Sequence, residues 1–239
     1  MAGWCEPAHD CLVIAPANAE KSIAMTVARW WQAVIAVVVA ASLVIQLTLI
    51  LEGGADANSG QSSASVQLGV RLWRLFSYFT IQSNLIVLAA AIVVLLSPLR
   101  DGPIWRVVRL DALLGITITG LVYAIVLAPQ VHLTGAALVA TTGLHYISPW
   151  AAVLAWLVFG PRPRMTWLTV LGAFVWPVLW LVYIFAQGAF TRWYPYPFLD
   201  VTKLGFAGAV RNALVVLLIG IVLACVAKVL DRTLRALLR

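Results

Sequence analysis

Two residue types that together perform nucleophilic catalysis, a hydroxyl and an imidazole, occur inside apolar stretches of this chain. Thr80 belongs to a polar run at 77–84, and His145 lies within the apolar stretch 136–159. An imidazole can accept a hydroxyl proton while the oxygen attacks an acyl group, and can then return that proton to the leaving group. The pair therefore indicates acyl-transfer chemistry, provided that the fold brings the two side chains together.

The composition indicates that these stretches cross a membrane. Of the 239 residues, 63% are hydrophobic and only 10% are charged, which is typical of a polytopic membrane protein. The net charge of +7 would suggest nucleic acid as the partner of a soluble protein. Here the basic residues lie in short loops beside apolar runs, where they set topology and contact anionic lipid. We therefore expect membrane lipid, and no nucleic acid, as the partner.

A spanning helix needs about 20 apolar residues, and the chain offers six such runs. The predicted fold is all-α, a six-transmembrane-helix bundle forming one domain over 25–239. The preceding tail, 1–24, mixes Pro, Ala, Asn and acidic residues without a period and is predicted to be flexible. The predicted spans are 28–51, 73–96, 109–129, 136–159, 166–187 and 205–230.

Basic residues flank these spans unequally. Eleven lie on the side of the termini and four on the other side, which predicts a multi-pass protein of the cell membrane with both termini cytoplasmic. The first group is Lys21, Arg29, Arg100, Arg106, Arg109, Arg162, Arg164, Lys228, Arg232, Arg235 and Arg239; the second is Arg71, Arg74, Arg192 and Lys203.

This topology places the polar residues at similar depth. By the helical rise, Thr80 is roughly 8 Å and His145 roughly 14 Å from the outer ends of their helices. Ser77, Thr80 and Asn84 follow a helical stripe, and Pro149 removes the backbone donor that would bond the carbonyl of His145, which predicts a kink there. We therefore expect one polar site in the outer half of the bundle.

Other polar residues near that level are candidates for binding the substrate or stabilising an oxyanion. The oxyanion donors could come from Asn84, Asn212 or Gln46, and Arg211 could bind an anionic head group. The spans are expected to lack a carboxylate that orients the imidazole, so this role falls to Asp200, to a freed carbonyl or to Thr141. The candidate residues are Asn84, Arg211, Asn212, Gln46, Tyr183, Trp180 and Asp200.

Each candidate also has a structural interpretation. A threonine in a membrane helix usually bonds its own i−4 carbonyl, and amide side chains commonly join helices. Arg211 can extend outward from a helix end, and the aromatic face of 176–187 can serve packing alone. Cys5, His9 and Cys11 lack a fourth ligand, and no dinucleotide or phosphate-binding glycine pattern occurs, so we expect no metal and no cofactor.

Three stretches resemble a known family. They are Tyr78-Phe79-Thr80-Ile81-Gln82-Ser83-Asn84, Leu144-His145-Tyr146, and the segment 194–201 that is followed by Arg211-Asn212. Together they are similar to the bacterial six-span relatives of the androgen-induced membrane hydrolase family, over most of 28–230. The animal members are threonine hydrolases that cleave fatty acid esters of hydroxy fatty acids. The resemblance implies that Thr80 is the nucleophile and His145 the base.

Two functions are consistent with these residues. The first is a threonine-dependent carboxylic ester hydrolase acting on lipid esters within the membrane. The alternative is a non-catalytic protein that binds or transports a lipid or small molecule in the same polar pocket. The 82–84 segment and the proline-rich stretch at 194–201 depart from the animal pattern, so the substrate stays open, as does the oligomeric state. A purely structural bundle would point Thr80, His145 and Arg211 to different faces.

Overall fold

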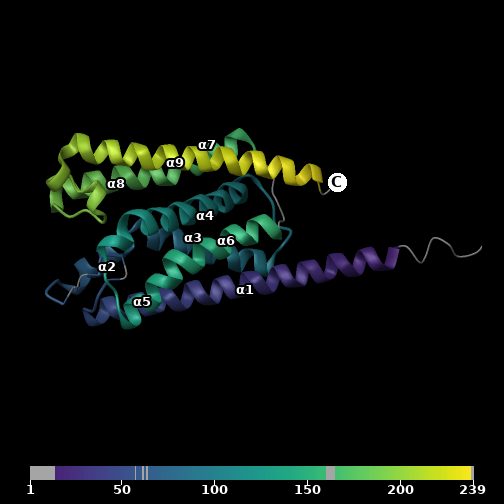
Figure 1. Cartoon of the computed structure of the whole chain (residues 1–239), viewed down its shortest axis with the longest axis horizontal. Helices are drawn as coiled ribbons and strands as arrows, with labels where there is room; N and C mark the ends of the chain where they lie inside the picture. Colours follow the sequence, from purple (N-terminus) through teal and green to yellow (C-terminus); the bar gives the residue numbers. More distant parts are fainter. Residues whose placement is uncertain (1–13, 57, 61, 63, 160–164, 238–239) are drawn as a thin grey trace, which may run out of the picture.

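The computed structural model describes residues 14–56, 58–60, 62, 64–159 and 165–237. Within these residues, six helical segments are long and apolar enough to cross a membrane. The all-α, six-span bundle is therefore confirmed, and Figure 1 shows its helices packed along one long axis. The segments are Ile23–Glu52, Phe79–Leu96, Pro103–Gln130, Gly135–Val158, Trp167–Thr191 and Val201–Thr233.

Several of these segments are divided into shorter helical elements. In chain order the elements are α1 (Ile14–Glu52), α2 (Leu68–Ser77), α3 (Phe79–Leu96), α4 (Pro103–Val122), π-helix η1 (Tyr123–Leu127), 3-10 helix η2 (Ala128–Gln130), α5 (Gly135–Thr141), π-helix η3 (Thr142–Ile147), α6 (Ser148–Val158), α7 (Trp167–Ala173), α8 (Val175–Thr191), 3-10 helix η4 (Pro197–Leu199) and α9 (Val201–Leu237).

Side-chain size decides which face of a helix is buried. On α9 most of the buried positions are Ala or Gly, whereas large aliphatic side chains such as Leu218 and Val222 are exposed. Lipid chains are as apolar as leucine, so membrane helices associate through small residues that allow close packing while large apolar residues face the lipid. The buried small residues of α9 include Ala209, Ala213, Gly220, Ala224 and Ala227.

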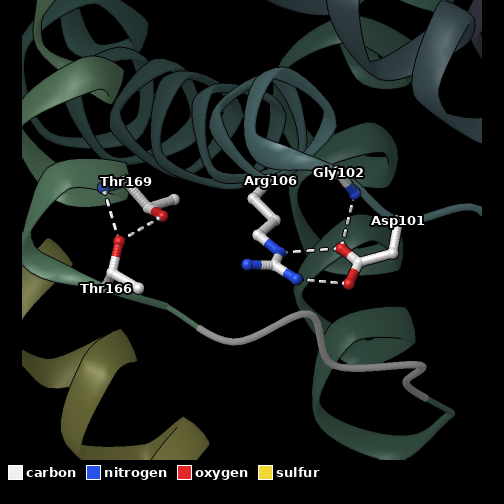
Figure 2. Close-up of polar contacts among 5 residues, drawn as sticks. All are labelled: Asp101, Gly102, Arg106, Thr166 and Thr169. Atoms are coloured by element: carbon white, nitrogen blue, oxygen red, sulfur yellow. Dashed lines mark hydrogen bonds and ion pairs between the residues drawn. The ribbon is translucent and has the colours of Figure 1, made fainter.

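The bundle has two distinct ends (Figure 1). The start of α1 and the end of α9 lie together at one end, where Asp101 accepts hydrogen bonds from Arg106 and from the Gly102 N–H, and Thr166 caps α7 through Thr169 (Figure 2). We call the other end the cap end. It consists of residues 53–56, 58–60, 62 and 64–67, of α2, and of the segment 192–200 with η4.

One prediction about the elements was wrong in part, and another is not tested. Helix α1 begins at Ile14, so residues 14–24 are helical, while 1–13 lie outside the described residues, and the flexibility of 1–24 stays a prediction. The helix predicted over 73–96 is interrupted, because Tyr78 is extended (φ −68°, ψ 129°) between α2 and α3. Ser77 consequently belongs to a different helix from Thr80 and Asn84.

Candidate active site at the cap end

The interruption at Tyr78 places Thr80 in the first turn of α3. Its N–H donates to the Tyr196 hydroxyl at 3.1 Å, because a residue in the first turn of a helix has no intrahelical acceptor. The Thr80 hydroxyl lies 3.4 Å from His145 Nε2 and 3.2 Å from the Tyr196 oxygen. The carbonyl four residues earlier, that of Phe76, accepts from Gln82 instead. The hydroxyl of Thr80 is therefore directed at His145 and Tyr196.

His145 lies inside the π-helix η3 and is buried. Pro149 follows four residues later, as the predicted kink required, and π-helical turns are frequent at functional sites. His145 Nδ1 lies 3.3 Å from the Thr141 carbonyl oxygen. A carbonyl can only accept, so this bond places the proton on Nδ1 and leaves Nε2 as an acceptor facing Thr80. That tautomer is the one a general base needs.

Two tyrosines complete the surroundings of the pair. The Tyr123 ring, at the start of η1, stacks on the imidazole with centroids 3.9 Å apart and an interplanar angle of 26°. Tyr196 approaches from the segment before η4, and burial raises its pKa to about 12. The Tyr196 hydroxyl therefore stays protonated at physiological pH. Its oxygen accepts from the Thr80 N–H, so its own proton is available to oxygen atoms at Thr80.

Sequence reasoning did not assign Tyr196 to the site. It lies 116 residues from Thr80 in the chain and in a loop, so neither helical spacing nor depth connects it with the polar stripe. The one available signal was the aromatic and proline-rich composition of 194–201, which indicated an ordered cap without indicating which ring points inward.

Asn84 joins the segment of Thr80 to the segment of His145. Its Nδ2 donates to the Thr80 carbonyl at 2.9 Å and to the Leu144 carbonyl at 3.2 Å. Since an amide nitrogen has two donors, both are occupied. Asn84 fixes α3 against η3, which is the structural alternative given above for amides, and its predicted role as an oxyanion donor is not supported.

The structure does not bring three other candidates to Thr80. Arg211 is exposed on α9, as expected for an arginine near a helix end. Asn212 donates to the Phe198 carbonyl at 3.0 Å and thereby holds η4. Asp200 accepts from the N–H and hydroxyl of Thr202 and pairs with Lys203 at 3.7 Å, so it caps α9 and does not orient His145.

Of the remaining candidates, two contact Ser77 at the interruption between α2 and α3, and the third lines another cavity. Trp180 Nε1 donates to the Ser77 carbonyl at 2.9 Å, and the Tyr183 hydroxyl lies 2.8 Å from Ser77 Oγ. Gln46 is fully buried on α1 and lines a separate cavity with Leu75 and Ile81. Of these three, only Trp180 also lines the cavity that contains Thr80.

That cavity runs between α3, α4, α8 and α9 and occupies about 800 Å³, its open mouth included. Thr80, Tyr123 and Tyr196 line it at the cap end, and nearly all other lining side chains are apolar. Along α4 and into η1 the lining extends from Asp111 to Tyr123, which is about 18 Å by the helical rise. The cavity is thus elongated and largely apolar, with Thr80 at its cap end.

Comparisons with protein-family models, with characterised proteins and with solved structures find no match to this chain.

One span contains a buried carboxyl group, Asp111, which lies in α4 with 8% of its surface exposed. It escaped notice because it follows Arg109 at the beginning of an apolar run and resembles an ordinary polar flank. Asp111 is at the far end of the cavity from Tyr123 and His145. The imidazole is oriented by the Thr141 carbonyl, one of the three alternatives given for that role.

Proposed function

We propose that this protein is an intramembrane hydrolase of long-chain lipid esters, with Thr80 as the nucleophile and His145 as the general base. The observation that carries the proposal is the 3.4 Å approach of Thr80 Oγ1 to His145 Nε2 beside an apolar cavity of acyl-chain length. The resemblance to the androgen-induced membrane hydrolase family supports the same two roles. With the termini cytoplasmic, the site opens to the outer leaflet of the cell membrane.

The chemistry follows from the tautomer of His145. The acyl chain of the substrate lies in the cavity and its carbonyl carbon reaches Thr80. His145 Nε2 accepts the hydroxyl proton as Oγ1 bonds to that carbon. Collapse of the tetrahedral intermediate breaks the ester C–O bond, and the imidazolium protonates the departing alcohol. Water, deprotonated by His145, then hydrolyses the acyl-Thr80 ester and releases the fatty acid.

Tyr196 supports the transition state in this mechanism. Its hydroxyl lies 3.2 Å from the Thr80 oxygen, close to where negative charge develops on the attacked carbonyl. A protonated phenol preorganised in an apolar site stabilises such charge more than water does. Tyr196 thus takes the role that the sequence suggested for Asn84, Asn212 or Gln46.

A non-catalytic lipid binder or transporter is the second candidate. The apolar lining of the cavity favours it, since such a space holds a lipid chain without any chemistry. The two candidates differ in whether the Thr80 hydroxyl is needed for turnover of a bound ester.

The test is hydrolysis of a long-chain ester by the purified protein in detergent. We expect Thr80→Ala and His145→Gln each to lower the rate at least about 10³-fold, because the nucleophile and its base act as a unit. Thr142→Ala is the matched control, since this threonine is half-buried and bonds its own i−4 carbonyl at 2.8 Å. Equal rates in Thr80→Ala and the control would favour the binder.

A further inference from the structure

The far end of the cavity carries a buried acid that the proposed mechanism does not use. Asp111 lines the cavity, is 8% exposed, and its Oδ1 has no hydrogen-bond partner among the described residues. An oxygen atom of this kind in an apolar environment costs free energy unless a donor reaches it. Ionisable residues inside membrane segments usually mark a binding site or a pathway for that reason.

Among the described residues, the lining of the cavity supplies no cation to Asp111. In the described part of the chain, no lysine, arginine or histidine lines the cavity. Arg109, two residues earlier on α4, lines a different cavity together with Gln32. The donor for Asp111 is therefore expected from a molecule inside the cavity.

Polar atoms continue from Asp111 along one wall of the cavity. Asp111, Gly115 and Thr119 are spaced four residues apart on α4, Tyr123 follows at the same spacing at the start of η1, and all four line the cavity. The Thr119 hydroxyl also lacks a partner among the described residues. Ser83 Oγ, likewise unpartnered there, lies 3.1 Å from where a Cβ of Gly115 would be. The wall thus offers hydrogen-bonding oxygens opposite the apolar side chains of α8 and α9.

We propose that Asp111 binds a free hydroxyl group at the end of a lipid chain that is remote from the ester. A hydroxyl presents one donor, which matches a single unpartnered carboxyl oxygen. An ammonium group would present three donors and would form a buried ion pair, whose desolvation is costly. The distance between Asp111 on α4 and Tyr123 at the start of η1 is about 18 Å by the helical rise, which corresponds to the length of an extended fatty acyl chain.

The placement of the ester at Thr80 rests on the proposed function, but the binding of the hydroxyl does not. The preferred ligand is accordingly an acyl ester whose chain bears a terminal hydroxyl, in place of an unsubstituted chain.

Binding can be measured without turnover on the Thr80→Ala protein in nanodiscs, by the fluorescence of Trp176 and Trp180 beside the cavity. The probes are methyl palmitate, the same ester with a terminal hydroxyl, one with a mid-chain hydroxyl, and one with a terminal amine. We expect the terminal hydroxyl to strengthen binding about tenfold over methyl palmitate, the value of one good hydrogen bond. Asp111→Leu should abolish this preference, and Asp111→Asn should retain part of it.

Equal binding of methyl palmitate and its terminal hydroxyl derivative by the Asp111-containing protein would overturn the proposal, and this comparison needs no Asp111 variant. Stronger binding of the mid-chain hydroxyl or of the terminal amine would also overturn it. A preference that survives in Asp111→Leu would place the hydroxyl elsewhere. A tenfold preference together with unimpaired hydrolysis by Thr80→Ala protein would support the hydroxyl site while contradicting the proposed nucleophile.

Discussion

Three side chains from distant parts of the sequence meet at one oxygen atom. The Thr80 hydroxyl is within 3.4 Å of His145 Nε2 and within 3.2 Å of the Tyr196 oxygen, and all three residues are buried. A buried hydroxyl that bonded only its own helix would be structural. This hydroxyl is held between an imidazole acceptor and a phenol, which is the arrangement that activates a nucleophile.

The raised pKa of Tyr196 predicts a pH dependence of stability. Its pKa is about 12 in the folded protein and about 10 when unfolded. Between these values the folded state retains a proton that the unfolded state has released, so stability is complete below about pH 10 and falls as the pH rises. Thermal unfolding measured from neutral to alkaline pH should show this fall.

The Tyr196→Phe variant is the control for that measurement, because it has no phenol to titrate. Its unfolding temperature should decline less above about pH 10 than that of the unmodified protein. Parallel curves for the two proteins would contradict the assignment of the alkaline loss to Tyr196.

The residues that could be predicted are those whose position is indicated by the sequence of their own helix. His145 stood out by its depth in the membrane and by Pro149, and Thr80 by its place in a polar stripe at similar depth, while the family resemblance implied their roles. The structure places the two side chains in contact. Tyr196 was missed because its position depends on the path of a loop. Arg211 was assigned to the site by depth alone, and depth does not tell which face of α9 points inward.

At the scale of the elements, the interruption between α2 and α3 makes the site possible. It ends α2 at Ser77 and exposes carbonyl groups that side chains then satisfy. Gln82 donates to the Phe76 carbonyl at 2.9 Å and accepts from Trp176 Nε1 at 2.9 Å. The aromatic face of α8 therefore stabilises the interruption between α2 and α3. Its side chains pack against this stretch and also donate hydrogen bonds to it.

Replacing Gln82 by leucine should weaken this interruption. The change leaves the Phe76 carbonyl and the Trp176 N–H without their partners, which should cost about 1–3 kcal/mol. Resistance to unfolding by a denaturing detergent measures the loss. Gln130→Leu is the matched control, because Gln130 is exposed and bonds the Val126 carbonyl within its own turn. Equal losses in both variants would contradict a special role of Gln82.

The sequence could not predict this interruption, because 73–96 contains neither proline nor glycine. The polar cluster at 77–84 was read as one helical stripe, since spacing by 3.6 residues assumes an unbroken helix. Side-chain contacts accompany the break instead of a local helix breaker. Trp180 donates to the Ser77 carbonyl and Gln82 to the Phe76 carbonyl, both of which an intact helix would use internally. By contrast, the distortion at His145 had a local cause in Pro149 and was predictable.

At the scale of the whole molecule, the cavity lies where α4 faces α8 and α9. Small residues on α9, among them Ala213 and Gly220, line this space and leave room for an acyl chain. The six spans were predictable from hydropathy because each must satisfy its own backbone in lipid. Their order around the bundle, and so the cavity, depends on packing between helices that no single segment encodes.

Filling the cavity should discriminate between substrates by length. Leu217 lines it on α9, so Leu217→Trp should lower hydrolysis of a long-chain ester about tenfold or more while sparing a short-chain ester, since only the long chain needs that space. Leu218→Trp is the control, because Leu218 is 60% exposed on the outer face of the same helix. The same decline with both ester lengths would argue against an acyl-chain cavity.

The most direct measurement is to locate the covalent adduct formed by a long-chain fluorophosphonate. The protein is treated with the reagent in detergent, digested, and sequenced by mass spectrometry. The proposed mechanism predicts one phosphonylated residue, Thr80, with labelling lost in Thr80→Ala and strongly reduced in His145→Gln. Absence of an adduct under conditions that label a known serine hydrolase, or an adduct at another residue, would contradict Thr80 as the nucleophile.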